Sequence, residues 1–309
     1  MSDNLRGSLW MVLAMAGFGV EDAFFKAATA TGTVSAGSGM VLFGSMALAL
    51  SALLARARGV ALWHPGYLRR QLLLRSGFEL VGRLFFALSL AYAPLAVTSA
   101  ILQAAPIVVM LGAVLVLGER IGPRRWLAAA IGLAGVVVIL RPSPEGIRAD
   151  TLLAVAAMLG FALRDLVTRA TPADVHGAQL GILGFAVVIL AGLAILAAEP
   201  GPPPLPDGRG LALIAATALA GLAGYSALTA AMRTGEIAVV APFRYFRLIV
   251  ALVLALAVFG ERPDAATLAG AAAIVGAGLY ALLREGRRRA GLAGADRLKR
   301  PMQHRERPR

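Results

Sequence analysis

Four long stretches of this chain contain no Asp, Glu, Lys or Arg: residues 84–118, 175–198, 210–232 and 265–283. A helix needs only ~20 consecutive apolar residues to cross a lipid bilayer, so each stretch is long enough to span one. The composition agrees, because 59% of the residues are hydrophobic and 15% are charged, which is too few charges for a soluble surface. These features predict an all-α integral membrane protein.

Charges, prolines and glycine clusters divide the chain into ten apolar segments, and we predict that each is a transmembrane helix. Because the first segment is too long for the apolar core of a signal peptide, we expect it to be retained. The predicted helices cover residues 8–28, 36–55, 71–92, 97–117, 124–141, 151–169, 177–197, 210–232, 239–259 and 265–283.

A sequence repeat divides these helices into two halves. Residues 15–27, MAGFGVEDAFFKA, and 158–170, MLGFALRDLVTRA, match at six positions, and Gly-Glu-Arg recurs at 118–120 and 260–262. Five spans per half force the second copy to enter the membrane in the opposite direction, so we predict inverted repeats, as in many secondary transporters. The predicted domains are 1–144 and 150–284, followed by a basic, disordered cytoplasmic tail, 285–309.

The net charge of +13 reflects membrane topology, and we expect no nucleic-acid partner. Ten of the thirty Lys and Arg residues lie between Arg284 and Arg309, and most of the others flank apolar segments. With both termini in the cytoplasm, 22 Lys or Arg fall on the cytoplasmic side and 5 on the other. The positive-inside rule therefore predicts an inner-membrane protein with both termini cytoplasmic.

Several ionisable residues lie within the predicted spans, where a charge is costly unless it faces protein or water. Asp22 and Asp165 occupy equivalent repeat positions, and we expect them to pair with Lys26 and Arg169 one helical turn further on. Glu79 and Arg83 have the same four-residue spacing, so they too are placed to pair.

Arg244 and Arg247 share a helix face, and two like charges there require an anion. That anion is either a neighbouring carboxylate, giving a structural salt-bridge network, or a substrate. In the second case Arg83 and Arg244 hold a carboxylate or phosphate through forked hydrogen bonds. The candidate substrate-binding residues are Arg83, Arg244, Tyr245, Arg247, Gln103 and Tyr225.

Carboxylates at membrane depth also allow coupling to protons, because burial favours their uncharged form. The candidate coupling or structural carboxylates are Glu21, Asp22, Glu79 and Asp165. Pro106 and Pro242 lie inside the fourth and ninth predicted helices, where they free backbone carbonyls that a cavity can use. Prolines of this kind also occur in membrane helices without any gating role, and the sequence leaves both interpretations open.

An enzymatic function finds no support in the sequence. The three histidines, His64, His176 and His304, are scattered, there is no cysteine, and no metal-binding or nucleophile motif is present. We therefore expect no metal, no cofactor and no catalytic residue.

The Gly-Glu-Arg ends of the fourth and ninth helices, and the glycine-rich helices that follow them, carry a family resemblance. Together with the segment APFRYFRLIVALVLALAVFGERP at 241–263, they resemble the EamA-type branch of the drug/metabolite transporter superfamily over residues 8–284. The resemblance implies a ten-helix transporter whose central cavity is lined by its first, third, fourth, sixth, eighth and ninth helices. It does not imply a particular substrate.

Our functional prediction is a secondary transporter that moves a small anionic or zwitterionic metabolite across the inner membrane by alternating access. Its expected partners are that metabolite and the lipid bilayer, and we expect a monomer or a weak homodimer. Two alternatives remain open: an exporter of amino acids or amphipathic drugs, and a membrane scaffold that transports nothing.

Overall fold

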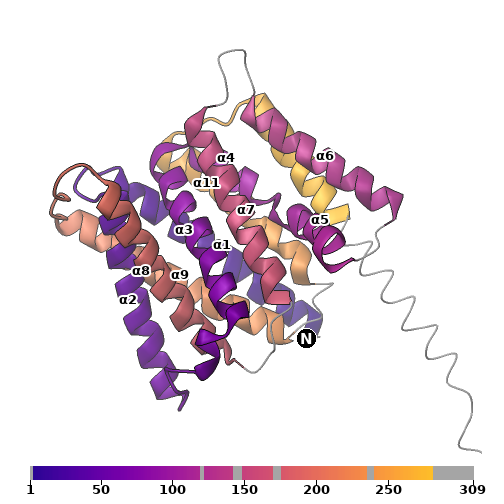
Figure 1. Cartoon of the computed structure of the whole chain (residues 1–309). Coiled ribbons are helices and arrows are strands. Elements are labelled where there is room, and N and C mark those ends of the chain that lie inside the picture. Colours follow the sequence, from indigo (N-terminus) through magenta and orange to yellow (C-terminus); the bar gives the residue numbers. More distant parts are fainter. Residues whose placement is uncertain (1–2, 119–121, 142–147, 170–174, 235–239, 281–309) are drawn as a thin grey trace, which may run out of the picture.

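The computed structural model of this chain describes residues 3–118, 122–141, 148–169, 175–234 and 240–280, and every regular element in these ranges is a helix. The predicted tail 285–309 lies outside the described residues, as do Glu119 and Arg120 of the first Gly-Glu-Arg motif. Figure 1 shows the helices as one bundle coloured along the chain.

Each half of the chain supplies five membrane segments. The first half contains α1 (Asp3–Thr29), α2 (Ala36–Ala57), the 3-10 turn η1 (Pro65–Leu68), α3 (Arg70–Tyr92), α4 (Leu95–Leu102), α5 (Ala105–Leu117) and α6 (Pro123–Leu140). The second half contains α7 (Ala149–Arg169), α8 (Gly177–Ala198), α9 (Gly208–Thr234), the 3-10 turn η2 (Ala241–Tyr245), α11 (Phe246–Phe259) and a last helix, Ala265–Tyr280.

Seven of the described segments are long and apolar enough by themselves to cross a membrane. Two shorter apolar helices, Trp126–Leu140 and Ala265–Tyr280, bring the number to nine. The tenth is α3, whose length of 23 residues is sufficient but which carries Arg75, Glu79 and Arg83 in its central part. The prediction of ten helices in two five-helix repeats is confirmed, and α3 buries Arg75 and Glu79 within the bundle.

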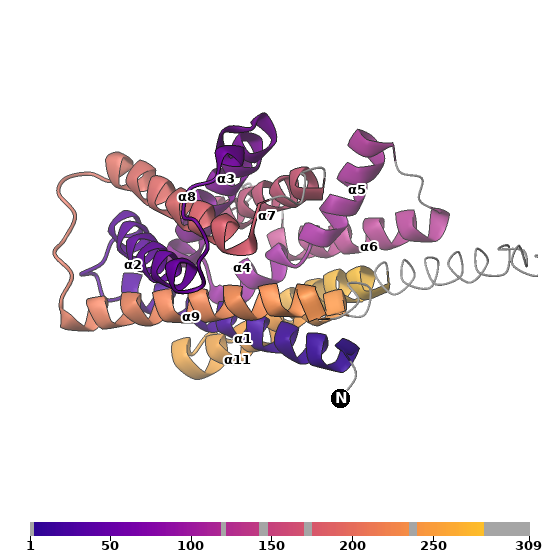
Figure 2. The same ribbon diagram turned by 90° about the horizontal axis from the view of Figure 1, so that it is seen from below.

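Helix packing follows the two-fold relation of inverted repeats. The most extensive contacts join α1 to α9, α3 to α7 and α2 to α8. The helices equivalent to α1, α2 and α3 in the second repeat are α7, α8 and α9. Exchanging the two halves therefore converts the α1–α9 pair into the α7–α3 pair and leaves the α2–α8 pair unchanged. Figure 2, seen from below, shows α1 beside α9 and α3 beside α7, so the core lies where the two repeats interlock.

Glycines allow these crossings to be close, at equivalent points of the two repeats. A Cβ atom added to Gly17 would lie 2.9 Å from the Cα atom of Gly224, where α1 crosses α9. A Cβ atom on Gly160 would lie 2.7 Å from the Cα atom of Gly82, where α7 crosses α3. Real Cβ atoms do not approach backbone atoms so closely, so both helix pairs depend on the missing side chains.

Two predicted helices are interrupted, again at equivalent positions. The fourth helix was expected to be continuous over 97–117, but it breaks at Gln103 and Ala104 between α4 and α5. The ninth begins as the 3-10 turn η2, which gives way to α11 after Tyr245. In the first case the cause is Pro106, which has no N–H for the carbonyl of Leu102. The two breaks meet, because Gln103 Nε2 donates to the carbonyl of Arg244 at 3.4 Å.

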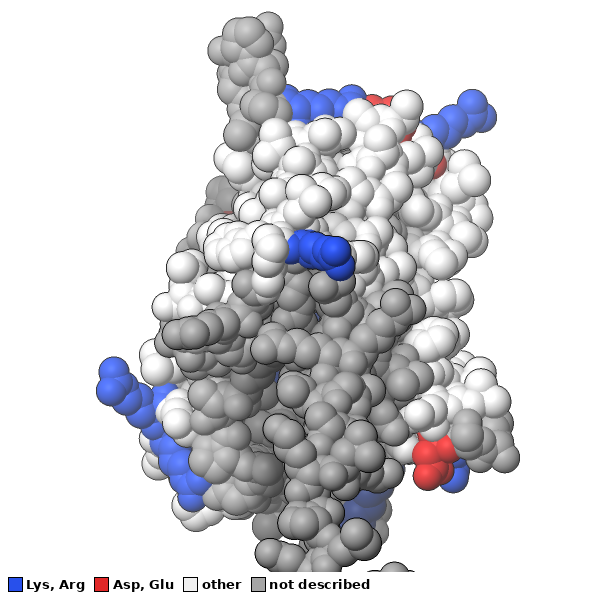
Figure 3. Space-filling view, turned by 90° about the vertical axis from the view of Figure 1, so that its right-hand side faces the viewer, with Lys and Arg blue, Asp and Glu red and all other residues white. Residues whose placement is uncertain are grey.

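The helices that close each half, α6 and Ala265–Tyr280, lie side by side at one edge of the bundle (Figure 1). Their contact is also formed by glycines, because a Cβ atom on Gly135 would lie 2.7 Å from the carbonyl oxygen of Gly270. On the face shown in Figure 3, most charged side chains of the described residues lie toward the two ends, and uncharged side chains make up most of the coloured surface between them. A lipid-facing surface requires this distribution.

Candidate functional site

One face of α3 carries a stripe of three charged side chains. Arg75, Glu79 and Arg83 follow one another at intervals of four residues, so they lie on the same side of the helix. At 1.5 Å per residue, the stripe extends about 12 Å along the helix axis. Arg75 and Glu79 are buried in the bundle. α3 is therefore polar toward the protein interior, as expected of a helix that lines a polar path.

Asp22 of α1 forms a two-point ion pair with Arg247 of α11. Arg247 donates from Nε to one carboxylate oxygen at 2.9 Å and from Nη2 to the other at 2.7 Å. The expected pairing of Asp22 with Lys26 is wrong. Lys26 lies one turn closer to the end of α1, where it contacts Glu261 and the carbonyl of Ala93. The guanidinium of Arg247 also lies 5.5 Å from the ring centroids of Phe18 and Phe86, so it is enclosed by aromatic faces.

Glu79 holds arginines from two helices. Its Oε2 lies 2.9 Å from Nη1 of Arg75, and its Oε1 lies 3.5 Å from Nη1 of Arg164 in α7. Arg164 also donates to the adjacent Asp165, from Nη2 at 2.8 Å. The expected pairing of Glu79 with Arg83 is therefore wrong, because α7 brings Arg164 against Glu79. The expected partner of Asp165, Arg169, has a side chain outside the described residues.

Arg83 faces Glu21 of α1 across a longer distance. Nη1 of Arg83 lies 3.7 Å from Oε1 of Glu21, which is an ion pair without a hydrogen bond. The Nε atom of Arg83 is buried and has no hydrogen-bond partner. One side of the guanidinium lies 5.9 Å from the ring centroid of Phe161. Arg83 therefore keeps a donor free.

A small cavity opens beside this pair, between α1, α2, α3 and α9. Its volume is about 10 Å³, close to the minimum that holds one water molecule. The charged residues that line it are Glu21, Asp22 and Arg83, and the other lining side chains include Phe25, Phe43, Phe86 and Thr217. The cavity thus combines one free guanidinium donor with aromatic walls.

The carboxylate of Glu261, in the second Gly-Glu-Arg motif, closes one end of the bundle. It accepts hydrogen bonds from the backbone N–H groups of Leu95 at 3.0 Å and Ala96 at 3.2 Å. Lys26 lies 3.6 Å from the same carboxylate and donates to the carbonyl of Ala93 at 2.7 Å. This end contact joins α1, α3, α4 and the end of α11.

The other predicted site residues lie around the helix breaks or near α8. Arg244 has no ion pair with any described residue, although its charge lies close enough to Asp165 to interact with it. Tyr245 is buried against Gly278 of the last helix, and its hydroxyl has no hydrogen-bond partner. Tyr225 donates to the carbonyl of Gly177 at 3.1 Å. The structure therefore brings Gln103 and Arg244 together, and it places Tyr225 and Tyr245 outside the cavity lining.

Sequence reasoning missed two members of the charged network, Arg75 and Arg164. A signal was present in the repeat, because Arg164 occupies the position equivalent to Glu21. Arg164 and Glu21 both form ion pairs with α3: Arg164 pairs with Glu79, and Glu21 pairs with Arg83. The two repeats thus place opposite charges at equivalent positions, and both charges face α3.

Among the described residues, the charges of this network do not balance. Five arginines, from α3, α7, η2 and α11, face four carboxylates. The arginines are Arg75, Arg83, Arg164, Arg244 and Arg247, and the carboxylates are Glu21, Asp22, Glu79 and Asp165. Because an unpaired charge is costly at membrane depth, the network favours one additional anionic group. Within the described ranges, no three metal-ligating side chains come together.

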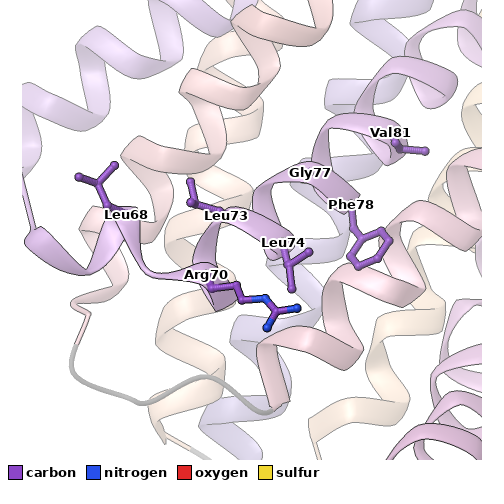
Figure 4. A pocket seen from close by; sticks show the side chains of 7 residues that line it. All are labelled: Leu68, Arg70, Leu73, Leu74, Gly77, Phe78 and Val81. Carbon is purple, nitrogen blue, oxygen red and sulfur yellow. The ribbon is translucent and has the colours of Figure 1, made fainter.

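A larger hollow lies on the outside of α3 (Figure 4). Its volume is about 490 Å³, and all of its lining residues come from η1 and α3. The lining residues are Leu68, Arg70, Leu73, Leu74, Gly77, Phe78 and Val81. This face is apolar and open, and it lies opposite the charged stripe, so lipid chains suit it better than a polar cargo does.

Comparison with protein families gives a match that covers both halves. The model described as the EamA-like transporter family matches residues 5–141 and 150–283. A solved crystal structure superposes with a TM-score of 0.63, covering 93% of this chain and 99% of that chain at 22% identity. At that identity the likeness shows a common fold alone.

Two kinds of curated protein are similar in sequence. A riboflavin transporter of Rhizobium johnstonii is 29% identical over 284 residues, covering 91% of this chain and 92% of that protein. An S-adenosylmethionine uptake transporter of Rickettsia felis is 27% identical over 207 residues, covering 65% and 69% respectively. A riboflavin transporter of Vibrio cholerae is 26% identical over 285 residues, covering 88% and 91%.

Proposed function

This chain belongs to the EamA-like transporter family, and from that premise we propose that it is a secondary transporter whose cargo is an anionic or zwitterionic metabolite with a carboxylate. Membership makes the chain an integral multi-pass membrane protein that transports small metabolites. The prediction that it is not an enzyme is confirmed by the family.

The observation that carries the proposal is the free donor of Arg83 beside the cavity. Arg247 is held at two points by Asp22, and Arg164 is held by Asp165 and Glu79. Arg83 has only its long ion pair with Glu21 and a buried Nε without a partner. Arg75 also has buried nitrogens without a hydrogen-bond partner, but it does not line the cavity. Because a guanidinium binds a carboxylate best through two parallel hydrogen bonds, Arg83 is the cavity-lining arginine with capacity to spare.

The known relatives are compatible with this chemistry. S-adenosylmethionine, the cargo named for the Rickettsia felis protein, carries a carboxylate and an ammonium group on one carbon. Its carboxylate would bind the guanidinium of Arg83 in place of the long ion pair with Glu21. The aromatic rings of Phe25, Phe43 and Phe86 around the cavity suit a positively charged or flat group on the same molecule.

A neutral aromatic cargo is the second candidate, and the same aromatic rings favour it. Riboflavin, named for the Rhizobium johnstonii protein, has a flat ring system but no carboxylate. Such a cargo would stack on the aromatic walls and would leave Arg83 paired with Glu21. The two candidates therefore differ in whether binding depends on Arg83.

Transport by alternating access requires the bundle to open. A cavity of about 10 Å³ cannot hold a metabolite, so this conformation is closed around the site. The pairs α1 with α9 and α3 with α7 join the two repeats symmetrically, and rocking one pair against the other would open one side at a time. We further propose that the protein lies in the inner membrane with both termini cytoplasmic, as the distribution of Lys and Arg favours.

The test is thermal unfolding of the purified protein in detergent with carboxylates, phosphates, amino acids, S-adenosylmethionine and riboflavin. A ligand that binds the folded state raises the midpoint as its concentration increases. We expect a rise with S-adenosylmethionine or another carboxylate that disappears in Arg83→Ala. Arg70→Ala is the matched control, because Arg70 lies on the outer face of the same helix (Figure 4).

Flux measurements in liposomes complete the test. We expect Arg244→Ala to abolish counterflow at an unchanged folded yield, because Arg244 has no ion pair with the described residues to lose. A midpoint that rises only with riboflavin, equally in Arg83→Ala, would replace the carboxylate cargo by the neutral aromatic one. A collapse of the folded yield in Arg244→Ala would return that arginine to a structural role.

A further inference from the structure

Glu21 is the least compensated of the four carboxylates in the charged network. Asp22 accepts two hydrogen bonds from Arg247, and the carboxylates of Glu79 and Asp165 lie within 2.9 Å of an arginine nitrogen. The ion pair of Glu21 is with Arg83 at 3.7 Å, too long for a hydrogen bond. Glu21 is also buried, so its charge rests on one weak contact.

The surroundings of Glu21 supply few other charges. Those that act on it are Asp22 on its own helix, Arg83 from α3 and Arg247 from α11. α9 presents Thr217 and Gly221, and a Cβ atom on Gly221 would lie 3.0 Å from the carboxyl group of Glu21.

Three further elements contact α1: η2, α2 and α4. η2 carries Arg244, whose charge is not among those that act on Glu21, and the other two elements are uncharged at this point. α2 presents Met40 and Phe43 to the cavity, and α4 (Leu95–Leu102) contains no ionisable residue. Because Asp22 is already held by Arg247, Arg83 is the cation that decides the charge state of Glu21.

We propose that Glu21 is the proton-coupling residue of this transporter, and that it shares Arg83 with the carboxylate of the cargo. This inference rests on the proposed function of the cavity. When the cargo carboxylate binds the guanidinium of Arg83, Glu21 loses its counter-charge and takes up a proton from water on the open side. When the cargo leaves on the other side, Arg83 returns to Glu21 and the proton is released with the cargo.

Electrostatics explain why the exchange is obligatory. Before binding, the pair consists of one guanidinium and one carboxylate. After binding, it consists of one guanidinium, the cargo carboxylate and an uncharged Glu21. The charge at the pair therefore stays constant when the cationic groups of the cargo lie against the rings of Phe25, Phe43 and Phe86. Arg244, the arginine of the network that has no ion pair with the described residues, does not line the cavity. A second carboxylate that remained ionised beside Arg83 would therefore be an unpaired charge at membrane depth, which is costly. Linkage requires the effect to be mutual, so a lower pH tightens binding of the cargo.

The experiment uses the full chain in liposomes, with radiolabelled S-adenosylmethionine as the carboxylate-bearing probe. Two readouts are compared: counterflow without a pH gradient, and accumulation driven by an acidic outside medium. We expect the wild type to show both, and we expect Glu21→Gln to lose at least tenfold of the driven accumulation when each variant's accumulation is divided by its own counterflow. Glu21→Asp, which keeps the carboxylate, should retain part of the driven accumulation.

Glu199→Gln is the matched control. Glu199 undergoes the same change from carboxylate to amide, but it caps α2 by accepting from Ser35 at 2.6 Å and from the N–H of Gly37 at 2.9 Å. It lies outside the charged network, so both readouts should match the wild type.

The outcomes separate this inference from the proposed function. Counterflow in the wild type without any response to the pH gradient overturns proton coupling and leaves transport intact. Absence of both counterflow and binding for every carboxylate tested overturns the proposed function itself. Driven accumulation that persists in Glu21→Gln shows that another group carries the proton.

A direct measurement protects against a variant that fails to fold. The wild-type protein in weakly buffered detergent solution, mixed with S-adenosylmethionine in the presence of a pH indicator, should take up close to one proton per molecule bound. Binding without proton uptake overturns the inference, whatever the yield of Glu21→Gln.

Discussion

The carboxylate of Asp22 and the guanidinium of Arg247 hold each other at two points across the boundary between the repeats, with both hydrogen bonds at or below 2.9 Å. These residues are 225 positions apart in the chain. The pair fixes α11 against α1 next to the cavity, and it lets two charges exist at membrane depth. We expect its role in this arrangement to be structural.

A double-mutant cycle tests that role. Because removing one partner leaves an uncompensated buried charge, we expect Asp22→Asn or Arg247→Gln to destabilise the protein by about 3 to 5 kcal/mol. The double variant should be more stable than either single variant, since it leaves no orphan charge. Unfolding midpoints in detergent measure this, and simple additivity of the two effects would show that the residues do not act as a pair.

The Gly82 and Gly160 crossing predicts a steric effect. We expect Gly160→Ala to cost about 1 to 3 kcal/mol, as overpacking typically does, because its Cβ atom would lie 2.5 Å from the backbone nitrogen of Gly82. Gly77→Ala is the control in α3, since no atom lies within 4 Å of the added Cβ. It should be neutral or stabilising, because Ala is the better helix former. Equal midpoints for the two variants would contradict the close crossing.

The fold could be predicted from the sequence because its determinants are local. Charge-free stretches such as 84–118 can only be buried in lipid or protein, and the repeat at 15–27 and 158–170 fixed the five-helix period. The interruption at Gln103 was harder to predict. Pro106 indicated a freed carbonyl, but membrane helices often continue past a proline, with a kink. Only the contact between Gln103 and Arg244 shows where the broken ends meet.

The partners within the site were not predictable from spacing alone. Asp22 and Lys26 are four residues apart on α1, which favours a pair along the helix, yet each binds a group from another helix. Arg247 is the second residue of α11 and Glu261 lies beyond its last residue, so Asp22 and Lys26 reach partners at different levels of the bundle. Which helix lies at each level depends on tertiary packing, and one sequence does not show it.

The end contact of Lys26 with Glu261 predicts a conformational effect. Glu261 accepts two backbone hydrogen bonds at the start of α4 and pairs with Lys26, so it holds three helices together over the closed cavity. A hydrogen bond to a charged group contributes about 1.5 to 3 kcal/mol. Losing one in Glu261→Gln should therefore shift the balance toward the state open at this end by roughly tenfold.

Cysteine labelling measures this shift, because the chain contains no cysteine of its own. A single cysteine introduced by Ala87→Cys would lie in the cavity lining at a site that is 1% exposed in the closed conformation. Its reaction with a polar maleimide should be slow in that background and roughly tenfold faster when Glu261→Gln is added. Glu199→Gln, which removes a comparable helix cap at α2, should leave the rate unchanged. Equal acceleration by both changes would mean that the loss of any helix cap loosens the bundle, and that Lys26 and Glu261 do not control access to the cavity.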